Sequence, residues 1–254
     1  MKGLVVISAL VGVLASCKEQ APPAAREATG KAAPNLEESL ANLVATGAGL
    51  QEVPFPVVIS GTTGKQVMPV DASDPVSAEI IEAIGRAVAT GIERLNQEDS
   101  PVRKLRRINE ASRFFEDELL GELNSMSGFA CEIPSTAGGG AQRSGYPDLK
   151  LTHQQSGRIA YLDPKLFEQG SRDSTFRSFY YEPKGETNKV LDDAHHLLIG
   201  IAHDGNDGDW RFVGWHLVDL SRLAIRFKPE FQASNRDLYR EGAILASDAE
   251  QSDN

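Results

Sequence analysis

Cysteine is scarce in this sequence, and its scarcity limits how the fold can be stabilised. Only Cys17 and Cys131 occur among 254 residues. Cys17 ends a signal-like segment, and the one remaining cysteine cannot form an internal disulfide, so the chain must depend on its apolar core. Cys131 lies in a strand-like apolar segment, which favours a buried small side chain over a nucleophile.

A long hydrophobic run is also missing at the N-terminus. The apolar run from Leu4 to Leu14 is too short to cross a bilayer core of ~30 Å as a helix. Lys2 precedes this run and Leu14-Ala15-Ser16-Cys17 follows it, an order that resembles a bacterial lipoprotein signal. The resemblance implies that residues 1–16 are removed and that acylated Cys17 anchors the chain to a membrane of the cell envelope, on its periplasmic or surface side. An ordinary signal peptide or an uncleaved anchor is the alternative.

Positively charged residues are fewer than negatively charged ones. The sequence has 26 Lys and Arg residues and 36 Asp and Glu residues, and its formal net charge is −10. This balance argues against a strong non-specific nucleic-acid binder, which usually carries a basic face. A local basic groove stays possible, since one short stretch is basic. That stretch is either a solvated face or a phosphate-contacting face, and it contains Arg103, Lys104, Arg106, Arg107 and Arg113.

Several catalytic and binding motifs are absent. Gly64-Lys65 has the spacing GxxGK rather than GxxxxGK, which excludes a phosphate-binding loop. The segment from Asp204 to Asp209 lacks the EF-hand register, since Gly208 stands where a ligand is needed. There is no GxSxG elbow. Three histidines without a recognised metal spacing favour a structural interpretation over a zinc site: His195, His203 and His216.

The order of elements predicts an α+β fold, a mixed β-sheet flanked by helices. Helices are expected at residues 36–50, from Asp74-Pro75, and from Ser100-Pro101, where a capping residue precedes proline. Strands are expected at residues 55–60, 66–70, 129–133, 146–152, 158–167, 176–181, 195–203, 211–219 and 225–231. We expect a tether at residues 17–50, a single globular domain at 51–245 and a polar tail at 246–254.

The stretch from Tyr146 to Lys165 carries the chemistry. It contains two apolar-alternating runs joined by a polar turn, with Pro147-Asp148 opening the first and Asp163-Pro164-Lys165 closing the second. Side chains alternate along a strand, so Asp163 and Lys165 project the same way, and a hairpin brings Asp148 near them. Two carboxylates suit Mg²⁺, and the lysine can orient a water or stabilise transition-state charge. The pattern predicts a phosphodiesterase centre.

Asp148, the fourteen residues that follow it and Asp163-Pro164-Lys165 together resemble the PD-(D/E)XK motif of restriction-endonuclease-like nucleases. The preceding segment, residues 112–129, is similar to the helix of Holliday-junction resolvases and relatives, in which a glutamate joins the metal site. The resemblance covers residues 102–165. It implies a restriction-endonuclease-like core, a DNA substrate, and a Mg²⁺ ion held by Asp148, Asp163 and Glu116, with Lys165 as a further catalytic residue. Pro164 suits only an edge or bulge position of a strand.

Two hypotheses of different classes follow. The first is a membrane-anchored, Mg²⁺-dependent nuclease. The second is a non-catalytic envelope lipoprotein that uses the same fold to bind a nucleic acid, a glycan or a protein partner. Convergence of Asp148 and Asp163 beside Lys165 favours the first. If the strands at 146–152 and 158–167 do not pair, the motif match is accidental and the domain is unrelated.

Overall fold

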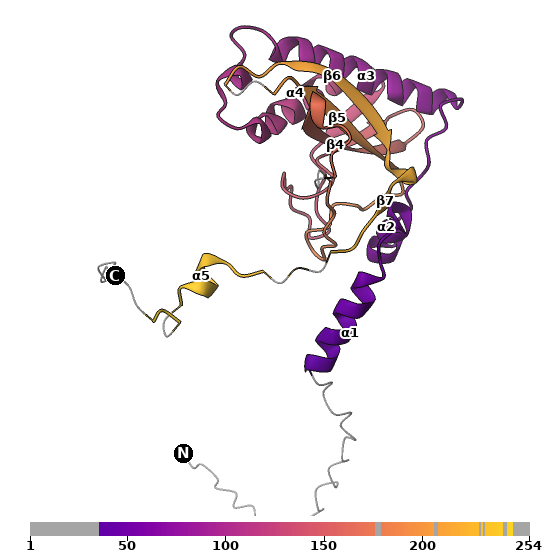
Figure 1. Ribbon diagram of the computed structural model, residues 1–254. Coiled ribbons are helices and arrows are strands. Elements are labelled where there is room, and N and C mark those ends of the chain that lie inside the picture. The colour runs from indigo at the N-terminus through magenta and orange to yellow at the C-terminus, as the bar shows by residue number, and fades with distance from the viewer. Residues whose placement is uncertain are drawn as a thin grey trace, which may run out of the picture. The chain divides into compact units, whose positions relative to one another are not determined.

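The computed structural model describes residues 36–175, 179–205, 208–228, 230, 232–240 and 243–245 (Figure 1). Contacts divide the chain into two units, residues 1–43 and 44–254. The expected helix α1 (Leu36–Ala48) begins in the first unit and ends in the second, which carries every strand found among the described residues. The predicted signal, Cys17, most of the tether and the tail at 246–254 lie outside the described residues. No helix of the described part is long and apolar enough to cross a membrane.

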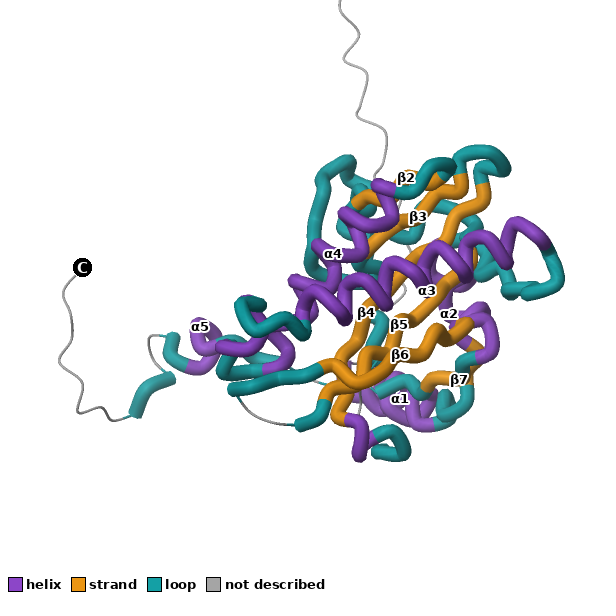
Figure 2. The backbone as a smooth tube through the Cα atoms, turned by 90° about the horizontal axis from the view of Figure 1, so that it is seen from above, coloured by secondary structure: helices purple, strands orange, loops and turns teal. Residues whose placement is uncertain are grey.

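The second unit is built on a five-stranded mixed sheet in the order β2-β3-β4-β5-β6. β4 and β5 are parallel, and the other neighbours are antiparallel. The strands are β2 (Phe129–Glu132), β3 (Leu149–His153), β4 (Arg158–Glu168), β5 (His195–His203) and β6 (Phe212–Asp219). Helices α3 (Pro75–Leu95) and α4 (Ser112–Ser125) lie across one face of this sheet (Figure 2). The predicted α+β class is confirmed.

The main core lies between this face and the two helices. Asp74 caps α3 by accepting a hydrogen bond from Ser77 N at 2.9 Å, and Pro75 occupies the first turn, as predicted. Side chains of α3 and α4 spaced one turn apart meet every second residue of the central strands. The buried strand residues of this core include Leu149, Leu151, Ala160, Leu162, Leu197, Ile199 and Ile201.

The predicted strand at residues 55–60 is wrong, because these residues form helix α2 (Phe55–Thr63). Proline in its first turn favours a helix start, and Gly64 closes it in the left-handed region at φ +72°, donating to Ser60 O at 3.0 Å. Phe55 and Ile59, one helical turn apart, are buried, whereas Val57, which a strand would bury with them, is 57% exposed. The expected strand at 66–70 reduces to a single parallel bridge from Val67 to Ala194.

The helix expected from Pro101 begins only at Ser112. Two short 3₁₀ turns, η1 (Pro101–Lys104) and η2 (Ile108–Ala111), replace its first half. Leu105 between them is extended, and its carbonyl accepts a hydrogen bond from Trp210 Nε1 at 2.9 Å instead of a helical N–H. A tertiary contact therefore overrides the local helix signal.

The remaining elements are short. β1 (Val53–Pro54) pairs with β7 (Ala224–Ile225). Of the strand expected at 225–231, Ile225 lies in β7, and the other described residues of that range, 226–228 and 230, form no strand. The other short elements are η3 (Gln169–Ser171), η4 (Leu220–Arg222) and α5 (Asn235–Leu238). The strand predicted at 176–181 is not confirmed: residues 176–178 lie outside the described part, and residues 179–181 form no strand.

The β3–β4 hairpin forms as predicted and creates an opening in the sheet. The strands pair from His153–Arg158 to Leu149–Leu162, and Asp148 N donates to Leu162 O at 3.2 Å. Beyond Leu162, β4 continues beside β5 alone. Pro164 therefore stands where β4 has a partner on one side only, which suits a residue without an N–H.

Candidate active site

The predicted acids and lysine meet at the opening where β3 leaves β4. Lys165 Nζ lies 3.0 Å from Asp163 Oδ2 and 3.7 Å from Asp148 Oδ2. Strand alternation places Asp163 and Lys165 on one face of β4. The hydrogen bond from Asp148 N to Leu162 O holds the end of β3 beside them. One ammonium group thus lies within ion-pair distance of two carboxylates.

Burial shifts the pKa values of Asp163 and Lys165. The Asp163 side chain is 3% exposed and that of Lys165 is 32% exposed. Burial raises the pKa of the Asp163 carboxyl to about 7; Lys165 opposes this rise and Asp148 adds to it. Burial by itself lowers the pKa of Lys165, but the Asp163 and Asp148 carboxylates outweigh it and hold that pKa above its ordinary value. Lys165 is therefore a charged, partly desolvated ammonium.

Glu116 lines the same hollow from α4. A pocket of about 300 Å³ is bounded by Glu116, Asp148 and Lys165 together with Arg143. Arg143 Nη1 lies 3.4 Å from Glu116 Oε2, and Arg143 Nη2 lies 2.7 Å from Asp117 Oδ1. Burial raises the pKa of Glu116, and the Asp148 carboxylate raises it further. All four predicted site residues are therefore gathered in one region, with Glu116 paired to an arginine.

The sequence did not single out Arg143 or Lys189. Lys189 is 1% exposed, and its Nζ lies 3.2 Å from Gln142 O and 3.4 Å from Arg143 O, as donor to both carbonyls. Burial lowers its pKa, against the attraction of Asp148 and Glu116. These two hydrogen bonds therefore fix the backbone of the loop that carries Arg143, the residue that contacts Glu116. A lysine next to Val190 carries no local signal of such a role.

The carboxylates of this site can be compared with the ligands that a divalent ion requires. Within the described ranges, no group of three or more His, Cys, Asp or Glu side chains is arranged to hold a metal ion. Mg²⁺ typically takes only one or two protein carboxylates and keeps several waters. Asp163 Oδ2 is buried and makes no hydrogen bond within the described part, although Lys165 Nζ is at ion-pair distance. A buried carboxyl oxygen without a hydrogen bond, in the field of the Asp148 carboxylate, fits such an ion.

Cys131 and two histidines of β5 lie outside this pocket. Cys131 is buried, and burial raises the pKa of its thiol to about 12, which confirms the interpretation as a small core side chain. His195 and His203 are both buried on β5 and belong to no metal-binding group of the described residues.

Comparison with known proteins gives one family and one relative. A family model described as the Type II restriction enzyme MjaV family matches residues 48–242, a range that includes every residue of the pocket. The Type II restriction enzyme MjaV of Methanocaldococcus jannaschii is 28% identical over 206 residues. The alignment covers 77% of this chain and 89% of that protein.

Proposed function

Because the chain belongs to the Type II restriction enzyme MjaV family, we propose that it is a Mg²⁺-dependent endonuclease that hydrolyses phosphodiester bonds of DNA. The observation that carries this proposal is the convergence of Asp148 and Asp163 on Lys165. Such convergence favours catalysis over the non-catalytic alternative, for which a buried carboxyl beside a half-buried one has no evident use. The family match supports DNA as the substrate.

Each residue has a role in this proposal. Asp148 and Asp163 would hold the ion, and Glu116 would support the site from the pocket wall. When bound, Mg²⁺ lowers the pKa of a bound water and neutralises charge on the phosphoryl oxygens. Lys165 keeps its proton because two carboxylates raise its pKa. Its ammonium can orient the attacking water or donate a hydrogen bond to the phosphoryl oxygen that gains charge.

The test is a nicking assay on supercoiled plasmid with the purified protein. We expect Mg²⁺-dependent relaxation and cutting, removal of that activity by EDTA, and its loss in Asp163→Ala and Lys165→Ala. Asp99→Asn, at an exposed position outside the pocket, is the matched control and should retain full activity. Equal activity in the wild type and both site variants would rule the proposal out. Circular dichroism of each variant separates loss of chemistry from loss of fold.

We also propose that acyl chains on Cys17 hold the protein in the cell envelope, on the periplasmic or surface side. The support is the order of Lys2, the apolar run and Leu14-Ala15-Ser16-Cys17 in the sequence. Buried acyl chains contribute about 0.8 kcal/mol per CH₂, so several chains hold a protein on a bilayer. Cys17→Ser should move the protein from the membrane fraction to the soluble fraction. A mature mass without added lipid would refute the anchor.

A further inference from the structure

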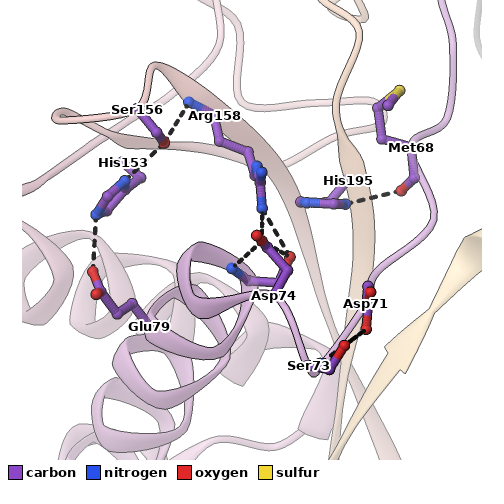
Figure 3. Close-up of polar contacts among 10 residues, drawn as sticks. Met68, Asp71, Ser73, Asp74, Glu79, His153, Ser156, Arg158 and His195 are labelled. Carbon is purple, nitrogen blue, oxygen red and sulfur yellow. Dashed lines mark hydrogen bonds and ion pairs between the residues drawn. The ribbon is translucent and has the colours of Figure 1, made fainter.

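A second cavity, of about 550 Å³, lies at the start of α3. Figure 3 shows several of the side chains that bound it. It is bounded by the capping turn of α3, the turn between β3 and β4, and the start of β5. Arg158 of this cavity and Asp163 are both on β4, about 16 Å apart at ~3.3 Å per residue, and strand alternation points them to opposite faces. The cavity is therefore separate from the nuclease-like site.

His195 provides the first sign that this cavity has a ligand. The side chain is buried, with 5% of the residue exposed. Its Nδ1 lies 2.9 Å from Met68 O, and since a carbonyl can only accept, Nδ1 carries the proton. In the neutral imidazole Nε2 is then a hydrogen-bond acceptor, and it has no partner in the described part of the chain. Figure 3 shows this end of the ring pointing away from Met68, toward Arg158 and Asp74.

A buried acceptor without a donor is costly, by about 1–3 kcal/mol, and such groups are rare in folded proteins. Arg158 does not supply the missing donor. Its Nη1 pairs with Asp74 and donates to Ser77 Oγ at 3.0 Å. A hydrogen-bond donor held in the cavity is the partner that His195 Nε2 lacks.

The charges of the lining select the kind of donor. Asp71 Oδ1 accepts hydrogen bonds from Ser73 N at 2.9 Å and from Ser73 Oγ at 2.7 Å, and Asp193 Oδ1 accepts one from Gln66 N at 2.7 Å. No ion pair of either carboxylate occurs among the described residues. With Arg158 already paired to Asp74, the lining keeps two uncompensated negative charges. A phosphate or nucleotide would meet repulsion here, whereas a cation would be attracted.

We propose that this cavity binds a small organic cation with two or more amino groups, a linear diamine or polyamine. The amino groups donate to His195 Nε2 and to the carboxylates of Asp71 and Asp193. The methylene chain between them lies against the apolar side chains of Met68 and Ile159. This site goes beyond the proposed nuclease function and does not depend on it.

Isothermal titration of the full protein with 1,4-diaminobutane tests the site at about 0.15 M salt, where interactions between exposed charges are screened. We expect saturable binding with one ligand per chain. Asp71→Asn and Asp193→Asn keep the side-chain shape at exposed positions, and each should weaken binding about tenfold by removing one charge-assisted contact. His195→Asn retains a donor for Met68 O but removes the Nε2 acceptor, and should weaken binding similarly.

Asp99→Asn, an exposed carboxylate outside the cavity, is the control and should bind as the wild type does. The inference is overturned if Asp99→Asn weakens binding as much as Asp71→Asn, because the effect is then general charge. It is also overturned if 1,4-butanediol binds as well as the diamine, if adenosine monophosphate binds in its place, or if Asp163→Asn removes binding. The last result would place the cation at the nuclease-like site.

Discussion

Replacement of Lys165 by methionine should make the stability of the protein strongly dependent on pH. Lys165 Nζ lies 3.0 Å from the oxygen of a carboxylate whose side chain is 3% exposed. The change removes the ammonium group next to Asp163, so that the Asp148 carboxylate remains beside Asp163 without a compensating positive charge from residue 165. Removing one partner of a buried ion pair typically costs about 3–5 kcal/mol. Because Lys165 is 32% exposed, we expect a smaller loss, about 1–3 kcal/mol.

The sign of the pH dependence follows from the pKa of Asp163. Its folded-state pKa, about 7, lies above the ordinary value of 3.8, so the folded protein binds more protons than the unfolded chain between these values. The contribution of Asp163 to the free energy of unfolding should therefore fall as pH rises from about 4 to 7 and then level off; burial lowers the pKa of His196 to about 3, which acts in the opposite direction below pH 6.5, so this contribution is measured as a difference between variants. Methionine at position 165 raises that pKa further. The variant should continue to lose stability above pH 7, so that the difference is small at pH 5 and largest at pH 9.

Urea denaturation at a series of pH values, in EDTA, measures this difference. Relative to the wild type, Asp163→Asn should gain stability as pH rises from 4 to 7, because it lacks the contribution of the Asp163 carboxyl. The double variant with both changes should recover most of the loss, because removing both members of a buried pair is far less costly than removing one. An equal loss at pH 5 and pH 9, or a double variant no more stable than Lys165→Met, would refute this account of the ion pair.

Three further outcomes are expected. Lys189→Ala leaves the carbonyls of Gln142 and Arg143 without their donor in a buried place and should lower the free energy of unfolding by about 2–4 kcal/mol; an unchanged urea midpoint would contradict this. Phe115→Ala removes a fully buried ring whose centroid lies 4.6 Å from that of Phe212 and should cost about 3–5 kcal/mol in the same assay. Cys131, buried and with its thiol pKa raised to about 12, should react with a thiol reagent only in denaturant; rapid reaction of the folded protein would show that it is accessible.

The parts of the fold that could be predicted depend on local chemistry. Asp74 followed by proline identifies the start of α3, and alternation in residues 146–167 identifies the β3–β4 hairpin. The β-branched residues of α2 are typical of a strand, and only proline in the first turn and Gly64 at the end make it a helix. The late start of α4 was not predictable, because the carbonyl of Leu105 is taken by Trp210, 105 residues along the chain.

The same distinction holds for the candidate site. Asp148, Asp163 and Lys165 lie on one hairpin, so spacing alone brings them together. Glu116 came from the family resemblance rather than from spacing. Arg143 and Lys189 are placed by contacts between loops that are distant in sequence, and no local pattern predicts such contacts.

The register of the β3–β4 hairpin fixes the positions of residues in both sites. Asp148 and Asp163 lie at its open end, and Arg158 lies at its turn. The smallest slip that keeps side chains on their proper faces is two residues, which would displace β4 along β3 by about 7 Å. A two-residue deletion within the hairpin would therefore separate the acids from each other and withdraw Arg158 from Asp74 in a single step.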